Sequence, residues 1–169
     1  MTPDHGKIVA EFLVRSLENE IPRTVGVFAA LPPDRLDYKP DPQSKTALAL
    51  MRHITLEDVW FVESIAAGHF GALPDDSDAC GLMTPQQCAE RYPQAMAAAI
   101  AKIRALSGED LVKDLNFMGA WTLPAIQFLS MTVHHSVHHR GQLSSYIRAM
   151  GGKVPSIYGP SADTQVAAV

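Results

Sequence analysis

Residues 132–143 read T-V-H-H-S-V-H-H-R-G-Q-L and hold four of the seven histidines in the chain. Two pairs of these histidines are four residues apart, His134 with His138 and His135 with His139. Residues four apart on an α-helix share a face, with about 5–6 Å between their Cβ atoms. The spacing therefore predicts a helix on which a pair of imidazoles can converge on one ion, since zinc binds imidazole nitrogen at about 2.0–2.1 Å.

The two histidine pairs lie on different faces of this helix. The face of His135 and His139 also carries residues that helices mostly bury: Phe128, Met131, Gln142 and Tyr146. The face of His134 and His138 carries residues that helices show to water: Gln127, Ser130, Gly141, Ser145 and Arg148. We therefore expect His135 and His139 to point into the protein core and His134 and His138 to lie nearer the surface.

A third ligand must come from another helix, because two histidines alone hold a metal ion weakly. The remaining histidines are His5 near the start of the chain, His69 at a predicted helix end, and His53. His53 lies in the middle of a predicted helix, on an apolar face that also carries Leu50, Leu56 and Trp60. The sequence therefore predicts a metal site made of His53, His135 and His139. The alternative is three core histidines that hydrogen-bond to protein groups.

The rest of the chain supplies the helices around this segment. Helical periodicity covers about residues 3–30, 45–68, 84–106 and 122–150, and the connections between them are rich in Pro, Gly and Asp. Without a convincing β pattern, this arrangement predicts an all-α, four-helix bundle. The length of 169 residues is that of one domain, so we expect a single helical bundle domain over residues 1–169.

Irregularities are expected at several points of the bundle. Pro22 should kink or split the first helix, and Pro93 should interrupt the third. Ser44 is a plausible cap for the second helix. Residues 108–119, between the third and fourth helices, should form a turn or a short strand pair, and residues 153–169 should be extended, with 167–169 frayed.

Glu57 stands one turn after His53. It can orient an imidazole, act on a bound water, or simply be a solvated residue on the flank of the helix. The motif H-E-x-x-H is absent from the sequence, which excludes a zincin. Paired E-x-x-H motifs are absent as well, which argues against a di-iron carboxylate bundle.

Composition excludes several classes of protein. The net charge of −4 and the pI near 5.9 argue against nucleic-acid binding. The sequence has no run of about 18 uncharged apolar residues for a membrane span, and its charged start is unlike a secretion signal. We therefore expect a cytoplasmic protein, in which Cys80 and Cys88 are free thiols or packing residues.

The sequence resembles the DinB/YfiT-like family of metalloproteins. Residues 135–143 match the signature H-x-x-H-H-R-G-Q-L on the last helix of that family's bundle. Residues 31–36, followed by Lys39-Pro40, resemble the family's exit from its first helix, and His53 falls where the family places its second-helix histidine. Residues 154–161 are similar to the tails of one branch, so that the resemblance covers nearly the whole chain.

The resemblance implies a four-helix bundle with a three-histidine site that holds zinc or nickel, and it implies a homodimer. Some relatives are transferases or isomerases that use low-molecular-weight thiols such as bacillithiol or mycothiol. Three protein ligands leave a fourth position open, which is typical of catalytic zinc. An ion there lowers the pKa of a bound water or thiol.

Two hypotheses about function follow. The first is a metal-dependent transferase or hydrolase, which acts on a small-molecule substrate with a thiol, or water, as cosubstrate. Neither Cys80 nor Cys88 stands at a predicted site position, so the thiol would come from outside the chain. Glu57 and Tyr158 are weak candidates for an acid or base, and no catalytic residue is predicted. The second hypothesis is a non-catalytic module, stabilised by the metal, that dimerises or senses a ligand.

Overall fold

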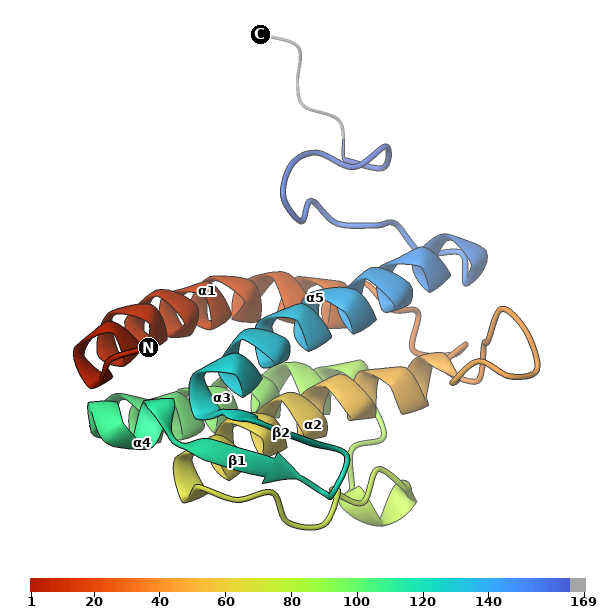
Figure 1. The fold of residues 1–169 in the computed structure, drawn as a ribbon. Helices are drawn as coiled ribbons and strands as arrows, with labels where there is room; N and C mark the ends of the chain where they lie inside the picture. The colour runs from red at the N-terminus through yellow and green to blue at the C-terminus, as the bar shows by residue number, and fades with distance from the viewer. Residues whose placement is uncertain (165–169) are drawn as a thin grey trace, which may run out of the picture.

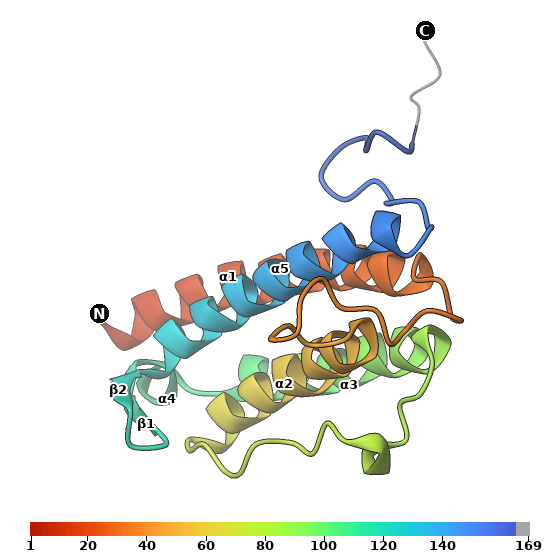
Figure 2. The same ribbon diagram turned by 90° about the vertical axis from the view of Figure 1, so that its right-hand side faces the viewer.

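The computed structural model describes residues 1–164 and shows an all-α bundle, as predicted (Figure 1). The four long helices are α1 (Pro3–Ala29), α2 (Ala47–Ala67), α3 (Pro85–Ala105) and α5 (Ala125–Ala149). Helix α1 packs against α3 and α5, and α2 packs against the same two helices. Figures 1 and 2 show α1 and α5 as one layer over a second layer of α2 and α3. Among the described residues, no helix has both the length and the hydropathy needed to cross a membrane.

The second helix begins two residues later than the cap at Ser44 predicts. Thr46 is the N-cap of α2, and its side chain accepts a hydrogen bond from the backbone N–H of Ala49. The Ser44 hydroxyl instead donates to Asp41 Oδ2 at 2.5 Å, within the loop before the helix. Both residues suit a cap by type, and the nearby Asp41 carboxylate decides between them.

The prolines do not split the helices. Pro22 lies inside α1 and Pro93 lies inside α3, and both helices continue through them. Each proline removes one backbone hydrogen bond. The helices persist because buried residues on both sides of each proline hold them in the core, Leu17 and Val27 in α1 and Tyr92 and Met96 in α3. The predicted interruption of the third helix is therefore wrong.

The segment between α3 and α5 contains both a turn and a strand pair. A short helix, α4 (Gly108–Val112), precedes an antiparallel hairpin of β1 (Asp114–Phe117) and β2 (Trp121–Pro124). A further 3₁₀ turn, η1 (Asp78–Cys80), lies in the loop before α3. Because residues 121–124 pair with β1, the last helix begins at Ala125 and not near residue 122 as predicted.

Arg140 joins α5 to α1 inside the bundle. Its side chain is almost fully buried, and its Nη1 lies 2.5 Å from Glu20 Oε2. The Tyr158 hydroxyl accepts a hydrogen bond from Arg140 Nη2 at 2.5 Å and donates one to Glu20 at 2.8 Å. Tyr158 therefore serves this contact between α1 and α5. A Cβ at the neighbouring Gly141 would meet no described atom of another element within 4 Å, so this glycine does not serve close helix packing.

The segment after α5 contains no helix up to residue 164, as predicted, but it bends at residues 157–159 and turns at residues 162–164, so it is not extended throughout. Asp163 holds it to the end of α5, since its Oδ2 accepts from Arg148 Nε at 2.8 Å and from the Val154 backbone N–H at 3.0 Å. The expected fraying of residues 167–169 lies outside the described residues.

Candidate metal site

Helices α2 and α5 bring His53, His135 and His139 together. The Nε2 atom of His53 lies 3.1 Å from that of His139 and 3.2 Å from that of His135. The three residues form a group whose ligand atoms all lie within 4.8 Å of one another, so they could hold a metal ion. Figure 2 shows the two helices that carry them, with α5 lying over α2.

Two of the rings have a fixed orientation, because a protein acceptor binds their other nitrogen. The His135 Nδ1–H donates to Asp58 Oδ1 at 2.8 Å, and the His139 Nδ1–H donates to Gln142 Oε1 at 2.7 Å. The Nε2 atoms of these two rings then carry only lone pairs. A single N–H on His53 Nε2 can donate toward these lone pairs, whereas a cation between the three nitrogens would bind all three. The donor set therefore fits a divalent metal ion, whose histidine ligands usually donate their second N–H to a protein acceptor.

The third ring has a carboxylate beside it. Glu57 Oε1 lies 2.7 Å from His53 Nδ1, but outside hydrogen-bonding geometry. Among the described residues, His53 Nδ1 is the one buried side-chain nitrogen or oxygen without a hydrogen bond. Glu57 Oε2 lies 3.8 Å from His135 Nε2, and the Glu57 side chain is only 19% exposed. Glu57 is therefore part of the site and not a solvated residue on the flank of α2.

Asp58 is the functional residue that sequence reasoning missed. It is fully buried and accepts a second hydrogen bond, from the Tyr92 hydroxyl on α3 at 2.7 Å. Burial, together with the Asp58 charge, raises the pKa of Tyr92 well above its ordinary value, so the phenol keeps its proton and remains a donor. Periodicity contained a signal for Asp58, because it shares a helical face with the buried Ile54 and Ile65.

His139 is suited to bind a metal at neutral pH. Burial, and to a smaller extent the neighbouring histidines, lower its pKa from 6.5 to about 4, against the opposing effect of the hydrogen bond to Gln142. The ring is therefore neutral near pH 7, and its Nε2 lone pair is free for a metal ion.

The helical faces predicted from periodicity are confirmed. His135 and His139 are part-buried, whereas His134 and His138 are exposed. Of the other histidines, His53 joins the group, and the exposed His5 and His69 do not. Gln142, expected on the buried face, is exposed, and its side-chain oxygen accepts a hydrogen bond from His139. Cys80 and Cys88 are free thiols, as predicted.

The surroundings of the three histidines differ on the side of His135 and on the side of His139. On the first side the Phe61 ring lies 5.4 Å from the His135 ring, and Phe117 of the hairpin stacks on Phe61 at 5.8 Å between ring centroids. On the second side is a cavity of about 250 Å³, whose lining residues include His139, Gln142 and Lys45. The site is thus bordered by aromatic rings on one side and polar groups on the other.

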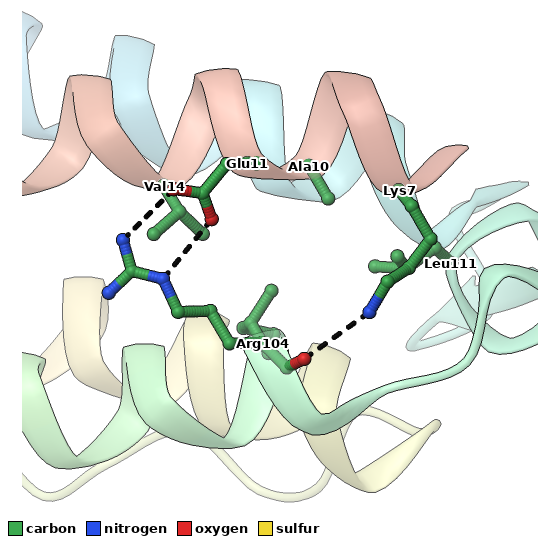
Figure 3. Close-up of a pocket in the computed structure, with 7 residues that line it drawn as sticks. Lys7, Ala10, Glu11, Val14, Arg104 and Leu111 are labelled. Carbon is green, nitrogen blue, oxygen red and sulfur yellow. Dashed lines mark hydrogen bonds and ion pairs between the residues drawn. The ribbon is translucent and has the colours of Figure 1, made fainter. Parts of the chain in front are cut away.

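A second cavity, of about 220 Å³, lies between α1 and the end of α3 (Figure 3). Its charged groups bind one another: Arg104 bonds Glu11 at 3.2 Å and Glu18 at 2.7 Å. Lys7 Nζ donates to the carbonyl oxygens of Arg104 and Leu106 at the end of α3. Because these groups are already paired, this cavity is a contact between helix ends and offers a ligand few free donors.

Comparisons with known proteins agree with the fold. The described fold is similar to that of a DinB-like protein from Bacillus cereus, with a TM-score of 0.73 and 22% identity over 88% of this chain and 97% of that one. It is also similar to the DinB-like protein YjoA from Bacillus subtilis, with a TM-score of 0.65 and 20% identity over 90% of this chain and 99% of that one.

One curated relative is the uncharacterized protein YrdA of Bacillus subtilis, which is 34% identical over 77 residues. The match covers 45% of this chain and 46% of YrdA, so the chain spans about half the length of this relative. The model of the DinB family matches residues 6–165, which is nearly the whole sequence. The chain therefore belongs to the DinB family.

Proposed function

We propose that His53, His135 and His139 bind one divalent ion, zinc or nickel, and that the protein is a metal-dependent transferase that uses a low-molecular-weight thiol, or water. The observation that carries the proposal is the convergence of three Nε2 atoms, two of which are left without a proton by Asp58 and Gln142. An ion held by three neutral imidazoles keeps a coordination position open and lowers the pKa of a thiol or water bound there.

The protein groups around the ion have separate tasks in this proposal. Asp58 and Gln142 hold two rings in the tautomer that leaves Nε2 free. Glu57 Oε2, at 3.8 Å from His135 Nε2, is placed to accept the thiol proton. In the transfer, the thiol sulfur bonds to an electrophilic carbon, the bond from that carbon to its leaving group breaks, and the leaving group departs with the electron pair.

The test is a metal-dependent rate with a thiol and an alkylating electrophile. The metal-loaded protein should consume a small thiol with iodoacetamide faster than the uncatalysed reaction, and the excess rate should disappear in His53→Ala. Several thiols should be compared at equal concentration. If the loaded protein matches the uncatalysed rate with every thiol, the transferase proposal fails.

A second candidate function is a non-catalytic module. It is favoured by the origin of the three ligands, since one comes from α2 and two from α5, so a bound ion would cross-link two helices. Homodimerisation also belongs to this proposal and is compatible with the first. Its support is a pair of exposed apolar side chains on α1, where Ile8 is 69% exposed and Phe12, one turn away, is 70% exposed.

A further inference from the structure

The cavity beside His139 lies directly against the three-histidine site. The loop before α2 supplies Gln43, Ser44 and Lys45 to its wall, and α5 supplies His139, Gln142 and Tyr146. Leu50, one turn before His53 on α2, completes the lining. The Tyr146 hydroxyl donates to the Lys45 carbonyl oxygen at 3.3 Å and so ties the loop to α5. A molecule in this cavity would contact a ligand imidazole, which is how a cosubstrate approaches an ion.

Two side chains of the cavity lining, Lys45 and Gln142, offer hydrogen-bond donors with capacity left. The Oε1 atom of Gln142 accepts a hydrogen bond from His139, and among the described residues the Gln142 amide NH₂ has no hydrogen-bond partner. Lys45 Nζ pairs with Asp76 at 3.3 Å, but both side chains are more than a third exposed, and such pairs contribute little. An ammonium group and an amide NH₂ donate and do not accept, so they suit an acceptor such as a carboxylate.

The acidic groups nearby are already engaged. Asp41 accepts hydrogen bonds from the Gln43 and Ser44 backbone N–H groups and from the Ser44 hydroxyl. These bonds hold the pKa of Asp41 below its ordinary value and fix its carboxylate within its own loop. Asp76 forms an ion pair with Lys45, and Lys45 can leave this pair to bind a ligand.

We propose that this cavity binds the carboxylate of a small thiol, with the Lys45 ammonium and the Gln142 amide as donors, while the thiol sulfur reaches the ion. This inference rests on the proposed thiol function and gives it a substrate class. The cavity has a volume of about 250 Å³. Sites for drug-sized ligands have volumes of about 300–1,000 Å³. The thiol is therefore small, or only its acidic end enters the cavity.

Cobalt-loaded protein and two matched thiols test the proposal. The probes are 3-mercaptopropionate and 3-mercapto-1-propanol, which have the same chain length and differ in the carboxylate. Titration of the sulfur-to-cobalt charge-transfer band gives the Kd of each. We expect 3-mercaptopropionate to bind about tenfold more tightly than 3-mercapto-1-propanol, because one charge-assisted hydrogen bond contributes a free energy of about this size. The preference should decrease with added salt, since Lys45 is half-exposed.

Two variants at Lys45 separate the carboxylate donor from the metal site. Lys45→Gln removes the charge, and Lys45→Glu reverses it. Both should retain cobalt and bind 3-mercapto-1-propanol as the wild type does, while the preference for 3-mercaptopropionate falls at least threefold in Lys45→Gln and further in Lys45→Glu. Lys102→Gln is the matched control, because Lys102 forms a similar surface ion pair with Glu63 but does not line the cavity. It should leave the preference unchanged.

The outcomes distinguish this inference from the proposed function. Equal affinity for the two thiols in the wild type, or a preference that survives both variants, would overturn carboxylate recognition and leave thiol activation standing. If cobalt is bound but neither thiol produces the band, thiol activation fails and the inference fails with it.

Discussion

The inner and outer faces of α5 each carry two histidines four residues apart, but the two pairs have different surroundings. His135 and His139 face α2, are part-buried, and have acceptors bound to their Nδ1 atoms. His134 and His138, one residue earlier in each case, are exposed. Two histidines at a chelating distance are thus not enough for a site. A third ligand on the facing helix and acceptors that fix the tautomer make the difference.

The largest effect should come from removing the inner ligands. The variant in which His53, His135 and His139 are all alanine should lose the tightly bound ion, from roughly one per chain to near zero, because a metal site needs about three or four ligands. The measurement is metal analysis of purified protein after dialysis.

The outer pair provides the control for this experiment. His134→Ala and His138→Ala should keep the metal content of the wild type. If either outer variant loses the ion, or the triple inner variant retains it, the distinction between the two faces is wrong.

A smaller effect is expected from the buried acceptor. Asp58→Asn leaves an oxygen near His135 but no longer supplies a charge, and we expect metal affinity to fall about 10- to 100-fold, as is usual when such an acceptor is changed. Competition with a chromophoric chelator measures the affinity. Glu63→Gln, an exposed change on the same helix, should have no effect. An Asp58→Asn affinity equal to that of the wild type would mean that the Asp58 contact serves packing only.

Removal of the ion should also lower thermal stability. A ligand present at about 100 times its Kd stabilises the folded state by about 2.7 kcal/mol, which corresponds to roughly 5–10 °C in Tm for a chain of this size. Melting with and without chelator should show this shift in the wild type and in His138→Ala. His135→Ala should not respond to chelator, and a full response there would place the ion elsewhere.

The smallest expected effect concerns the outer surface of α1. If Ile8 and Phe12 lie in a dimer interface, Phe12→Ser should weaken dimerisation about tenfold or more, since burial of a Phe side chain contributes about 1.5–3 kcal/mol. Sedimentation at micromolar concentration is the measurement, with Arg15→Ser on the same exposed stretch as comparison. A wild type that sediments only as an 18 kDa species would contradict the dimer.

Periodicity was sufficient to predict the helices and the inward face of α5, because both are set by which residues are apolar at a period of 3.6. It also selected His53 from the three histidines outside α5. It could not predict Asp58 as a partner of His135, because that contact joins α2 to α5 and depends on how the two helices pack. The same limit applies to Tyr92, which reaches Asp58 from α3.

The local errors have local causes. Ser44 and Thr46 are both suitable N-cap residues. The Ser44 hydroxyl is hydrogen-bonded to Asp41, and Thr46 caps the helix. The proline rule failed at Pro93 because the burial of neighbouring residues outweighs one lost hydrogen bond. A strand pair was one of two alternatives for residues 108–119, whereas the second strand of the hairpin extends to residue 124. Strands of four residues are too short to show a clear alternation in the sequence.

Two neighbouring residues of α5 serve different helices, and this limits how the helix can change during evolution. His139 turns toward His53 on α2, and Arg140 turns toward Glu20 on α1. Successive residues of an α-helix differ by about 100° in direction. A one-residue insertion or deletion just before His139 would therefore rotate both side chains away from their partners at once. Substitutions can accumulate along this helix, but changes in its length cannot, so related chains should align through it without gaps.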